Sequence, residues 1–219
     1  GNKPCRIYGR ANAEYLLLQM TGEHELQSMD YEVAAIAQSS RNFLFAAIPV
    51  ESWNDALSPW KSPAMWGKQG FGGNAADTLR FLMEQVIPIL KQQFPLPENV
   101  KIILGGYSLA GLFALYALYQ TDVFARAASM SGSFWFEGIM EYVCSHEMKR
   151  KPDCLYFSLG DKESSTDNPI LNVVQQNTQE IETLCHGKGI ETTFVLNSGS
   201  HYQACNKRTA AGIHWILNR

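Results

Sequence analysis

The stretch Ile102–Gly111 reads IILGGYSLAG, and it decides how the rest of the chain is interpreted. An apolar strand pattern leads into one serine, Ser108, and an apolar helix pattern follows at once, which is how a nucleophile elbow reads in sequence. Such a turn strains the backbone and brings its flanking residues together, which explains why Gly106 and Ala110 are small. The helix start presents backbone N–H groups and a partial positive charge beside the hydroxyl, where an oxyanion would be stabilised. The stretch therefore predicts a serine nucleophile.

The motif departs from strict G-x-S-x-G at one position, because Ala110 stands where the second glycine is usual. Alanine is still small enough for the turn, and Gly111 lets the helix start lie close to the sheet. The bare motif is common, so its placement between an apolar strand and an apolar helix carries the interpretation.

The composition is that of a globular chain with a substantial core. Of its 219 residues, 46% are hydrophobic and 18% are charged, and we expect a single domain over residues 1–219. The formal charge of −3 gives no attraction for nucleic acid or an anionic membrane, so neither is an expected partner. Residues 102–121 lack charge, but glycines divide them into a strand and a helix rather than a membrane span. A homo-oligomer is compatible with the sequence.

The cysteines are scattered along the chain, at Cys5, Cys144, Cys154, Cys185 and Cys205. Their odd number and their spacing show neither a disulfide framework nor a CxxC metal pattern. We therefore expect reduced thiols, no metal site and a cytoplasmic location.

Apolar runs of strand length alternate with helical patterns, which predicts an α/β fold with a mostly parallel central sheet and helices on both faces. No insertion after the serine is long enough for a large cap domain. Strands are expected at 14–20, 42–50, 100–104, 124–130, 154–159 and 191–196. Helices are expected at 24–39, 74–94, 109–119, 137–148, 167–184 and 202–217, and Pro88 should bend or shorten the helix at 74–94.

His201 occupies the position expected of a catalytic base. A serine hydroxyl needs a base within hydrogen-bond reach, and this architecture orders its residues Ser, acid, His on loops at the carboxyl ends of strands. His201 lies directly after the last predicted strand, in the run Asn-Ser-Gly-Ser-His. The other histidines fall in predicted helices or at a helix end, where surface or capping roles are the simpler interpretation: His24, His146, His186 and His214.

The acid is expected in the loop 160–167, GDKESSTD, after the strand at 154–159. A carboxylate there would bind the histidine Nδ1–H and fix its tautomer. Glu163 is the preferred candidate and Asp161 the alternative, and the sequence does not separate them cleanly. Asp167 stands in Asp-Asn-Pro, an ordinary helix start, and is interpreted as a helix cap.

An oxyanion hole needs two N–H groups. The amide of Leu109, directly after the serine, is the first, and we expect the second from the loop after the strand at 42–50, at Trp53 with Ser52 as the neighbouring alternative. Aromatic residues of the same sheet edge are expected to form an apolar substrate pocket: Tyr107, Trp60, Phe71 and Trp135, with Trp53, Phe136 and Tyr202.

With the elbow, acid loop and histidine loop in place, the chain resembles the esterase D-like branch of the α/β-hydrolases, which includes enterochelin esterases, S-formylglutathione hydrolases and feruloyl esterases. The resemblance implies an α/β-hydrolase fold and a Ser-acid-His esterase with neither metal nor organic cofactor. In this branch the acid commonly lies three residues after a loop glycine, which implies Glu163, although some siderophore esterases work with a Ser-His pair. The blocks that carry the resemblance span most of the chain: GGYSLAG, Trp53-Asn54-Asp55, Leu57-Ser58-Pro59-Trp60, residues 71–77, Ile87-Pro88, residues 131–135, residues 160–163 and Gly199-Ser200-His201.

These observations predict a serine hydrolase that cleaves a small-molecule carboxylic ester through an acyl-enzyme. An acyltransferase or a thioesterase would use the same residues on another acceptor or donor. The alternative from a different class is a catalytically silent hydrolase fold that binds a ligand.

Overall fold

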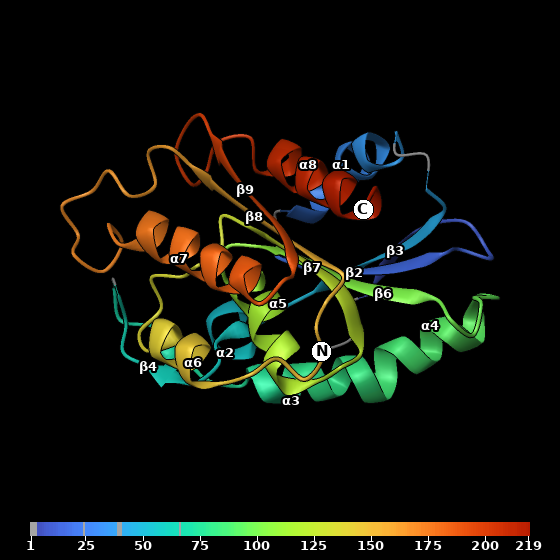
Figure 1. Cartoon of the computed structure of the whole chain (residues 1–219). Coiled ribbons are helices and arrows are strands. Elements are labelled where there is room, and N and C mark those ends of the chain that lie inside the picture. Colours follow the sequence, from blue (N-terminus) through green and yellow to red (C-terminus); the bar gives the residue numbers. More distant parts are fainter. Residues whose placement is uncertain (1–3, 24, 39–40, 66) are drawn as a thin grey trace.

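A seven-stranded sheet runs through the middle of the molecule (Figure 1). The computed structural model describes residues 4–23, 25–38, 41–65 and 67–219. The strands lie in the order β1-β3-β2-β6-β7-β8-β9; β1 is antiparallel to β3, and the other neighbours are parallel. Their bounds are Arg6–Gly9 (β1), Tyr15–Thr21 (β2), Phe43–Pro49 (β3), Lys101–Tyr107 (β6), Phe124–Met130 (β7), Cys154–Gly160 (β8) and Glu191–Asn197 (β9). A separate short ribbon pairs β4 (Lys61–Ser62) with β5 (Phe71–Gly72).

Helices cover both faces of the sheet (Figure 1). On one face lie α1 (Met29–Ile36), which follows the short helix η1 (Glu25–Gln27), and α8 (Cys205–Leu217). The other face carries α2 (Trp53–Leu57), α3 (Ala75–Phe81), η2 (Leu82–Val86), α4 (Ile87–Gln93), α5 (Leu109–Gln120), α6 (Ile139–Ser145) and α7 (Val174–Gly187). This arrangement confirms the predicted fold class.

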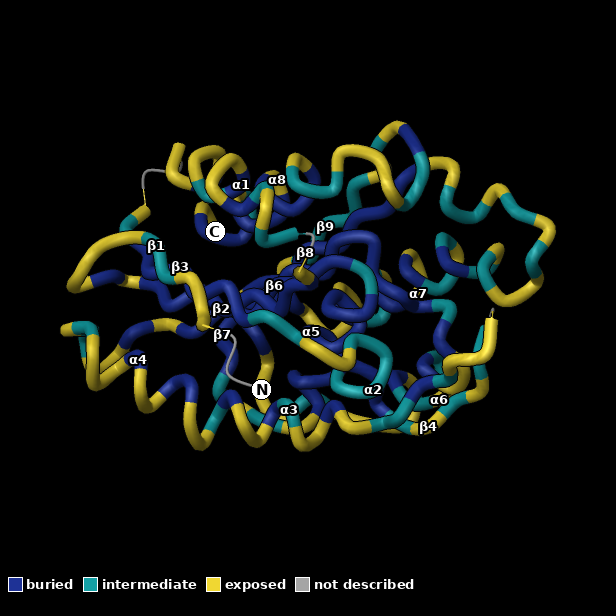
Figure 2. The backbone as a smooth tube through the Cα atoms, turned by 180° about the vertical axis from the view of Figure 1, so that it is seen from behind, coloured by how far each residue is buried: buried dark blue, intermediate teal, exposed yellow. Residues whose placement is uncertain are grey.

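Alternation along β2 divides the core into two layers. Leu16 and Leu18 face the cluster that contains α5, whereas Tyr15 and Leu17 face the cluster that contains α8. Every residue of β2 is buried, as expected for a central parallel strand covered on both faces (Figure 2). The α5 helix is apolar on all sides and is buried over 109–119, so it is a core helix. No helix among the described residues is long and apolar enough to cross a bilayer.

The chain order places a topological switch point between β2 and β6. From β2 the chain moves to β3 on one side, and it later returns to add β6 on the other side. Crossover connections leave in opposite directions at such a point, which opens a crevice outside the carboxyl ends of the strands. The residue after β6 is Ser108.

The six predicted strands are all present. The short elements β1, α2, β4 and β5 were not predicted, because two to five residues give too little periodicity to separate them from loops. The predicted helix at 24–39 shortens to α1 preceded by η1, while its position 24 and position 39 lie outside the described residues. The helices at 137–148 and 202–217 are also shorter than predicted.

Two predictions about helix ends need correction. Asp167 does not cap a helix, because α7 begins only at Val174; instead the Asn168 side chain accepts the Ile170 N–H at 2.9 Å and starts a turn. The helix expected at 74–94 is divided before Pro88 by the π-helical segment η2, where the Ile87 N–H donates to the Leu82 carbonyl five residues back.

Candidate active site

Ser108 stands at a sharp turn between β6 and α5. Its φ of +60° and ψ of −123° are unusual for a residue with a side chain, so the backbone is strained at this turn. A Cβ added at Gly106 would lie 2.5 Å from the backbone of Ala110, so only glycine fits there. The small residues around Ser108 therefore have a steric cause.

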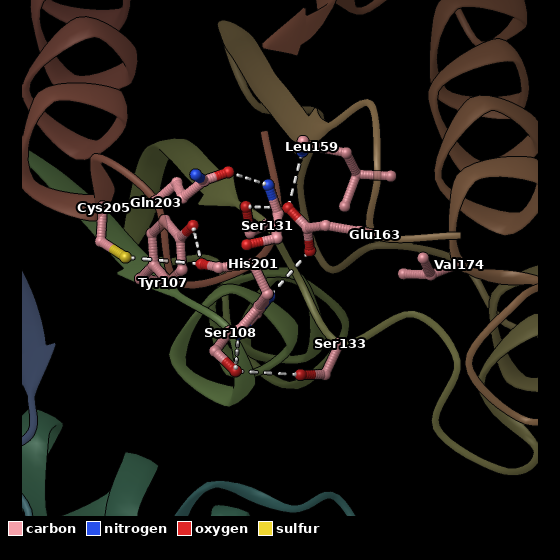
Figure 3. A network of polar contacts seen from close by, with 12 residues as sticks. Tyr107, Ser108, Ser131, Ser133, Leu159, Glu163, Val174, His201, Gln203 and Cys205 are labelled. Carbon is pink, nitrogen blue, oxygen red and sulfur yellow. Dashed lines mark hydrogen bonds and ion pairs between the residues drawn. The ribbon is translucent and has the colours of Figure 1, made fainter. Parts of the chain in front are cut away.

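A continuous line of hydrogen bonds joins three side chains from three loops (Figure 3). The Ser108 Oγ lies 3.1 Å from His201 Nε2, and His201 Nδ1 lies 2.7 Å from Glu163 Oε2. Because an ionised carboxylate only accepts hydrogen bonds, Nδ1 keeps its proton and donates a hydrogen bond to Glu163. Nε2 is then free to accept the hydrogen bond of the Ser108 hydroxyl.

Glu163 is held by donors on its second oxygen. The Ser131 hydroxyl donates to Oε1 at 2.7 Å, the Gly160 amide donates at 2.6 Å, and Arg208 lies 3.2 Å away. Burial by itself would raise the pKa of Glu163, but the hydrogen bond and charge of His201, with the Ser131 and Gly160 donors, bring that pKa below its usual value. The carboxylate is therefore ionised and fixed in position at neutral pH.

Asp161, the alternative acid, does not contact His201. Its Oδ1 accepts the Gly199 N–H at 2.8 Å, and its own N–H donates to the Asn197 carbonyl at 2.7 Å. These bonds tie the acid loop to the histidine loop. Of the two candidates, only Glu163 is placed on the histidine ring.

Further contacts position the histidine loop. The Tyr107 hydroxyl donates to the His201 carbonyl at 2.7 Å, and the Cys205 thiol lies 3.4 Å from the same oxygen. The Ser133 hydroxyl lies 3.4 Å from the Ser108 Oγ. The other described histidines lie on helices or at a helix end, at His146, His186 and His214, and His24 lies outside the described residues.

A cavity of about 650 Å³ opens beside the serine. Tyr107, Phe71 and Trp135, which the sequence predicts in a substrate pocket, line this cavity. Trp60 is not among the lining residues; its indole N–H donates to the Glu137 carbonyl at 2.9 Å, and its ring packs on Phe136. Trp60 therefore supports the wall from behind rather than facing the cavity.

The two expected oxyanion donors both border this cavity. Leu109 is the first residue of α5 and Trp53 is the first residue of α2. N–H groups in the first turn of a helix have no partner within that helix, so neither amide is used by its own helix. Asn54, one residue further, also lines the cavity.

Sequence reasoning missed the residues that support the acid. Arg208 is buried on α8 and donates to Glu163, to the Tyr107 hydroxyl at 3.3 Å and to the Ser198 carbonyl at 3.0 Å. An arginine in a helix with many polar residues is normally interpreted as a surface residue, so no local sequence signal indicated that Arg208 contacts the acid. Ser131 stood in a block that carries the family resemblance, and its place directly after a strand was the available signal.

Comparison with known proteins identifies the family of the chain. A model of the family described as "Putative esterase" matches residues 33–207, which is most of the chain. The uncharacterized protein YbbA of Bacillus subtilis (strain 168) is 22% identical over 198 residues, which are 86% of this chain and 78% of that protein.

Solved structures with a similar fold include two hydrolases. An IroE-like serine hydrolase from Shewanella oneidensis matches with a TM-score of 0.79 at 16% identity, over 98% of this chain and 75% of that one. The siderophore hydrolase EstA from Aspergillus nidulans matches with a TM-score of 0.74 at 16% identity, over 98% of this chain and 94% of that one. The family match and the α/β-hydrolase architecture together establish that the chain belongs to this esterase family and is a carboxylic ester hydrolase.

Proposed function

We propose that the chain hydrolyses its ester with Ser108 as nucleophile, His201 as general base and acid, and Glu163 as the carboxylate that orients the histidine. The observation that carries this proposal is the hydrogen-bonded line Ser108–His201–Glu163 at the elbow. Asp161 is left with a structural role, because its carboxylate bonds the Gly199 amide.

The first half of the reaction acylates the serine. Ser108 Oγ attacks the ester carbonyl carbon while its proton passes to His201 Nε2, and the carbonyl oxygen becomes an oxyanion that the Leu109 and Trp53 amides stabilise. Glu163 stabilises the imidazolium formed in this step. When the intermediate collapses, the bond to the alcohol oxygen breaks and His201 returns the proton to that oxygen.

The second half returns the enzyme to its starting state. A water molecule gives its proton to His201 Nε2 and attacks the acyl carbon, and the same amides stabilise the second oxyanion. Collapse releases the carboxylic acid, and the proton on His201 goes back to Ser108 Oγ. The three side chains, the two backbone amides and water supply every group that these steps need.

The cavity supports a small-molecule ester as substrate. Aromatic and aliphatic side chains make up much of its wall, and such surfaces suit an acyl or aryl group. We propose that residues 1–219 act as one domain, since all three loops leave the carboxyl edge of one sheet. The five free cysteines suit the reducing cytoplasm that we propose as its location.

The test is labelling with a fluorophosphonate probe, followed by mapping of the modified peptide by mass spectrometry. Modification at Ser108 is expected, with Ser108→Ala unlabelled and His201→Ala labelled far more slowly. Ser145→Ala is the matched control, because the hydrogen bonds of this exposed hydroxyl go to carbonyls of its own helix and to the neighbouring His146 ring. Thermal unfolding of each variant verifies the fold. Probe incorporation or ester hydrolysis that persists in folded Ser108→Ala would refute the assignment.

A further inference from the structure

Arg208 is a buried charged residue that the steps of the proposed reaction do not use. It lies on α8, and its side chain is only 2% exposed. Burying a guanidinium is costly, so the partners of this side chain indicate its role. Among the described residues, those partners are Glu163 and three of its neighbours in the candidate site: Tyr107, Ser131 and Ser198.

One terminal nitrogen of Arg208 contacts the acid, and the other contacts the histidine loop. Nη1 lies 3.2 Å from Glu163 Oε1 and 3.3 Å from the Tyr107 hydroxyl. Nη2 donates to the Ser198 carbonyl at 3.0 Å. The Tyr107 hydroxyl in turn donates to the His201 carbonyl at 2.7 Å (Figure 3). Arg208 therefore contacts the acid directly and holds the histidine loop by two routes, through Ser198 and through Tyr107.

The acid loop and the histidine loop meet the guanidinium at Gly160. A Cβ added at this position would collide with the Gly199 carbonyl and would lie 2.9 Å from both terminal nitrogens of Arg208. The Gly160 amide also donates to Glu163 Oε1 at 2.6 Å. Glycine at this position therefore lets both loops and the guanidinium approach one another closely.

The hydrogen bonding of Arg208 is incomplete. Its Nε is buried and has no hydrogen-bond partner among the described residues. A buried N–H without a partner costs stability, and an apolar side chain would fill the same space without that cost. The positive charge next to the ionised, buried Glu163 is what an apolar side chain could not supply.

The charge of Arg208 also acts on His201, because both residues contact the same carboxylate. Glu163 Oε2 attracts the imidazolium form of His201, whereas the guanidinium at Oε1 repels it. The neutral ring is the form that accepts the proton of Ser108. A positive charge at this place should therefore extend activity to lower pH.

Other titratable groups surround the acid and the base. Of the described residues that hydrogen-bond to the Glu163 carboxylate, Arg208 is the one with a permanent positive charge. The Tyr107 hydroxyl is neutral, because burial raises its pKa above the ordinary value. The remaining groups lie on the two loops, on α8 or in the wall of the cavity: Asp161, which accepts the Gly199 N–H, the exposed Lys162, Tyr202, Cys205, Glu25 and Glu32.

We propose that Arg208 is a positioning residue for the catalytic base. It joins the acid loop to the histidine loop, and its charge sets the lower pH limit of hydrolysis by favouring the neutral ring of His201. This inference rests on the proposed reaction at Ser108 and adds the residue that adjusts its base.

The first test is the pH dependence of kcat/KM for p-nitrophenyl acetate in wild type, Arg208→Gln and Arg208→Lys. Gln removes the charge and keeps a donor, whereas Lys keeps the charge and loses the forked donors. The acid limb of Arg208→Gln should move to higher pH by about one unit. That of Arg208→Lys should stay within about 0.3 units of wild type, although its kcat falls. An unmoved limb in folded Arg208→Gln, or a moved limb in Arg208→Lys, would overturn the inference.

Arg126→Gln is the matched control. Arg126 is also buried and also donates to a backbone carbonyl, that of Ile216 in α8, at 2.6 Å. It lies near the start of β7, at the opposite end of that strand from Ser131. Thermal unfolding verifies the fold of each variant, and Arg126→Gln should lose stability without moving the acid limb. An equal shift in this control would overturn the inference. If Arg208→Gln does not fold, Arg208→Met replaces it, because Met needs no hydrogen-bond partner.

The second test observes the histidine without turnover. Nitrogen-15 NMR of labelled histidine rings follows the protonation of His201 as pH changes, and its signals are assigned by their loss in His201→Ala. The midpoint of this protonation should rise by about one pH unit in Arg208→Gln and stay unchanged in Arg126→Gln. That rise without hydrolysis of any ester would support the role of Arg208 and refute the proposed reaction. Hydrolysis at Ser108 with an unchanged midpoint would refute the role of Arg208 and leave the proposed reaction standing.

Discussion

Replacing Glu32 by Gln should stabilise the protein, and the gain should grow with pH. The substitution keeps the shape of the side chain and an oxygen that can accept the Gln19 hydrogen bond. It removes a group whose pKa is about 8 in the folded protein because of burial, against an ordinary value of 4.5. The unfolded chain releases this proton well below neutral pH, whereas the folded protein retains it.

Proton linkage gives the sign and the size of this pH dependence of stability. Between pH 4.5 and about pH 8 the folded state binds one more proton at Glu32 than the unfolded state, so the stability of the wild type falls as pH rises. The slope is about 1.4 kcal/mol per pH unit. Glu32→Gln lacks this slope, so its free energy of unfolding should exceed that of wild type by about 3 kcal/mol more at pH 8 than at pH 5.

Urea denaturation at a series of pH values measures this difference, with the midpoint and the slope of each transition determined separately. The comparison of variant with wild type at each pH cancels the titration of groups that do not interact with Glu32. Glu180→Gln, an exposed substitution, should change the free energy of unfolding by less than about 0.5 kcal/mol throughout. Parallel stability curves for wild type and Glu32→Gln would refute the buried, proton-holding environment of Glu32.

Three other predictions concern the elbow and the acid. Glu163→Gln should lower kcat by about a thousandfold or more, whereas Asp161→Asn should lower it less than about tenfold, as steady-state hydrolysis of an aryl ester will show. Equal losses would mean that the acid is wrongly assigned. Gly106→Ala should cost about 2 kcal/mol or more in urea denaturation, because the new Cβ would lie 2.5 Å from the Ala110 backbone, and a neutral result would contradict that contact. Because the pKa of Glu163 is lowered, its contribution to stability is present above its ordinary value of 4.5 and is lost as pH falls through the lowered value. In urea denaturation at a series of acidic pH values, the free energy of unfolding of Glu163→Gln should therefore fall less steeply with falling pH than that of wild type. An unchanged fall would refute the lowered pKa of Glu163.

Much of the fold could be predicted because its signals are local. Continuous apolar runs such as the one in β3 read as strands buried on both faces, and α5 reads as a core helix. The boundaries failed where tertiary contacts or hydrogen bonds within turns replaced helix propensity. The clearest case is Asn168, whose side chain starts a turn that delays α7 to Val174.

The three residues of the hydrogen-bonded line Ser108–His201–Glu163 were predictable to different degrees. Ser108 and His201 each carry a local signal, a steric motif for the serine and a place directly after the last strand for the histidine. The choice between Glu163 and Asp161 was left to the fold, because two residues of one loop separate them and the path of that loop decides which carboxylate meets the ring.

The sequence by itself determined the tight turn at Ser108, the order of the three loops and the alternation of strands and helices, because each depends on sterics and periodicity among residues that are near one another in the chain. The tertiary structure decided the rest. It places Arg208 of α8 within hydrogen-bond distance of Glu163, and it directs the Trp60 indole N–H to the Glu137 carbonyl. It also places Glu32 of α1 in the wall of the cavity that Ser108 lines. These contacts join segments far apart in sequence, and they depend on which helices the sheet brings together on one face.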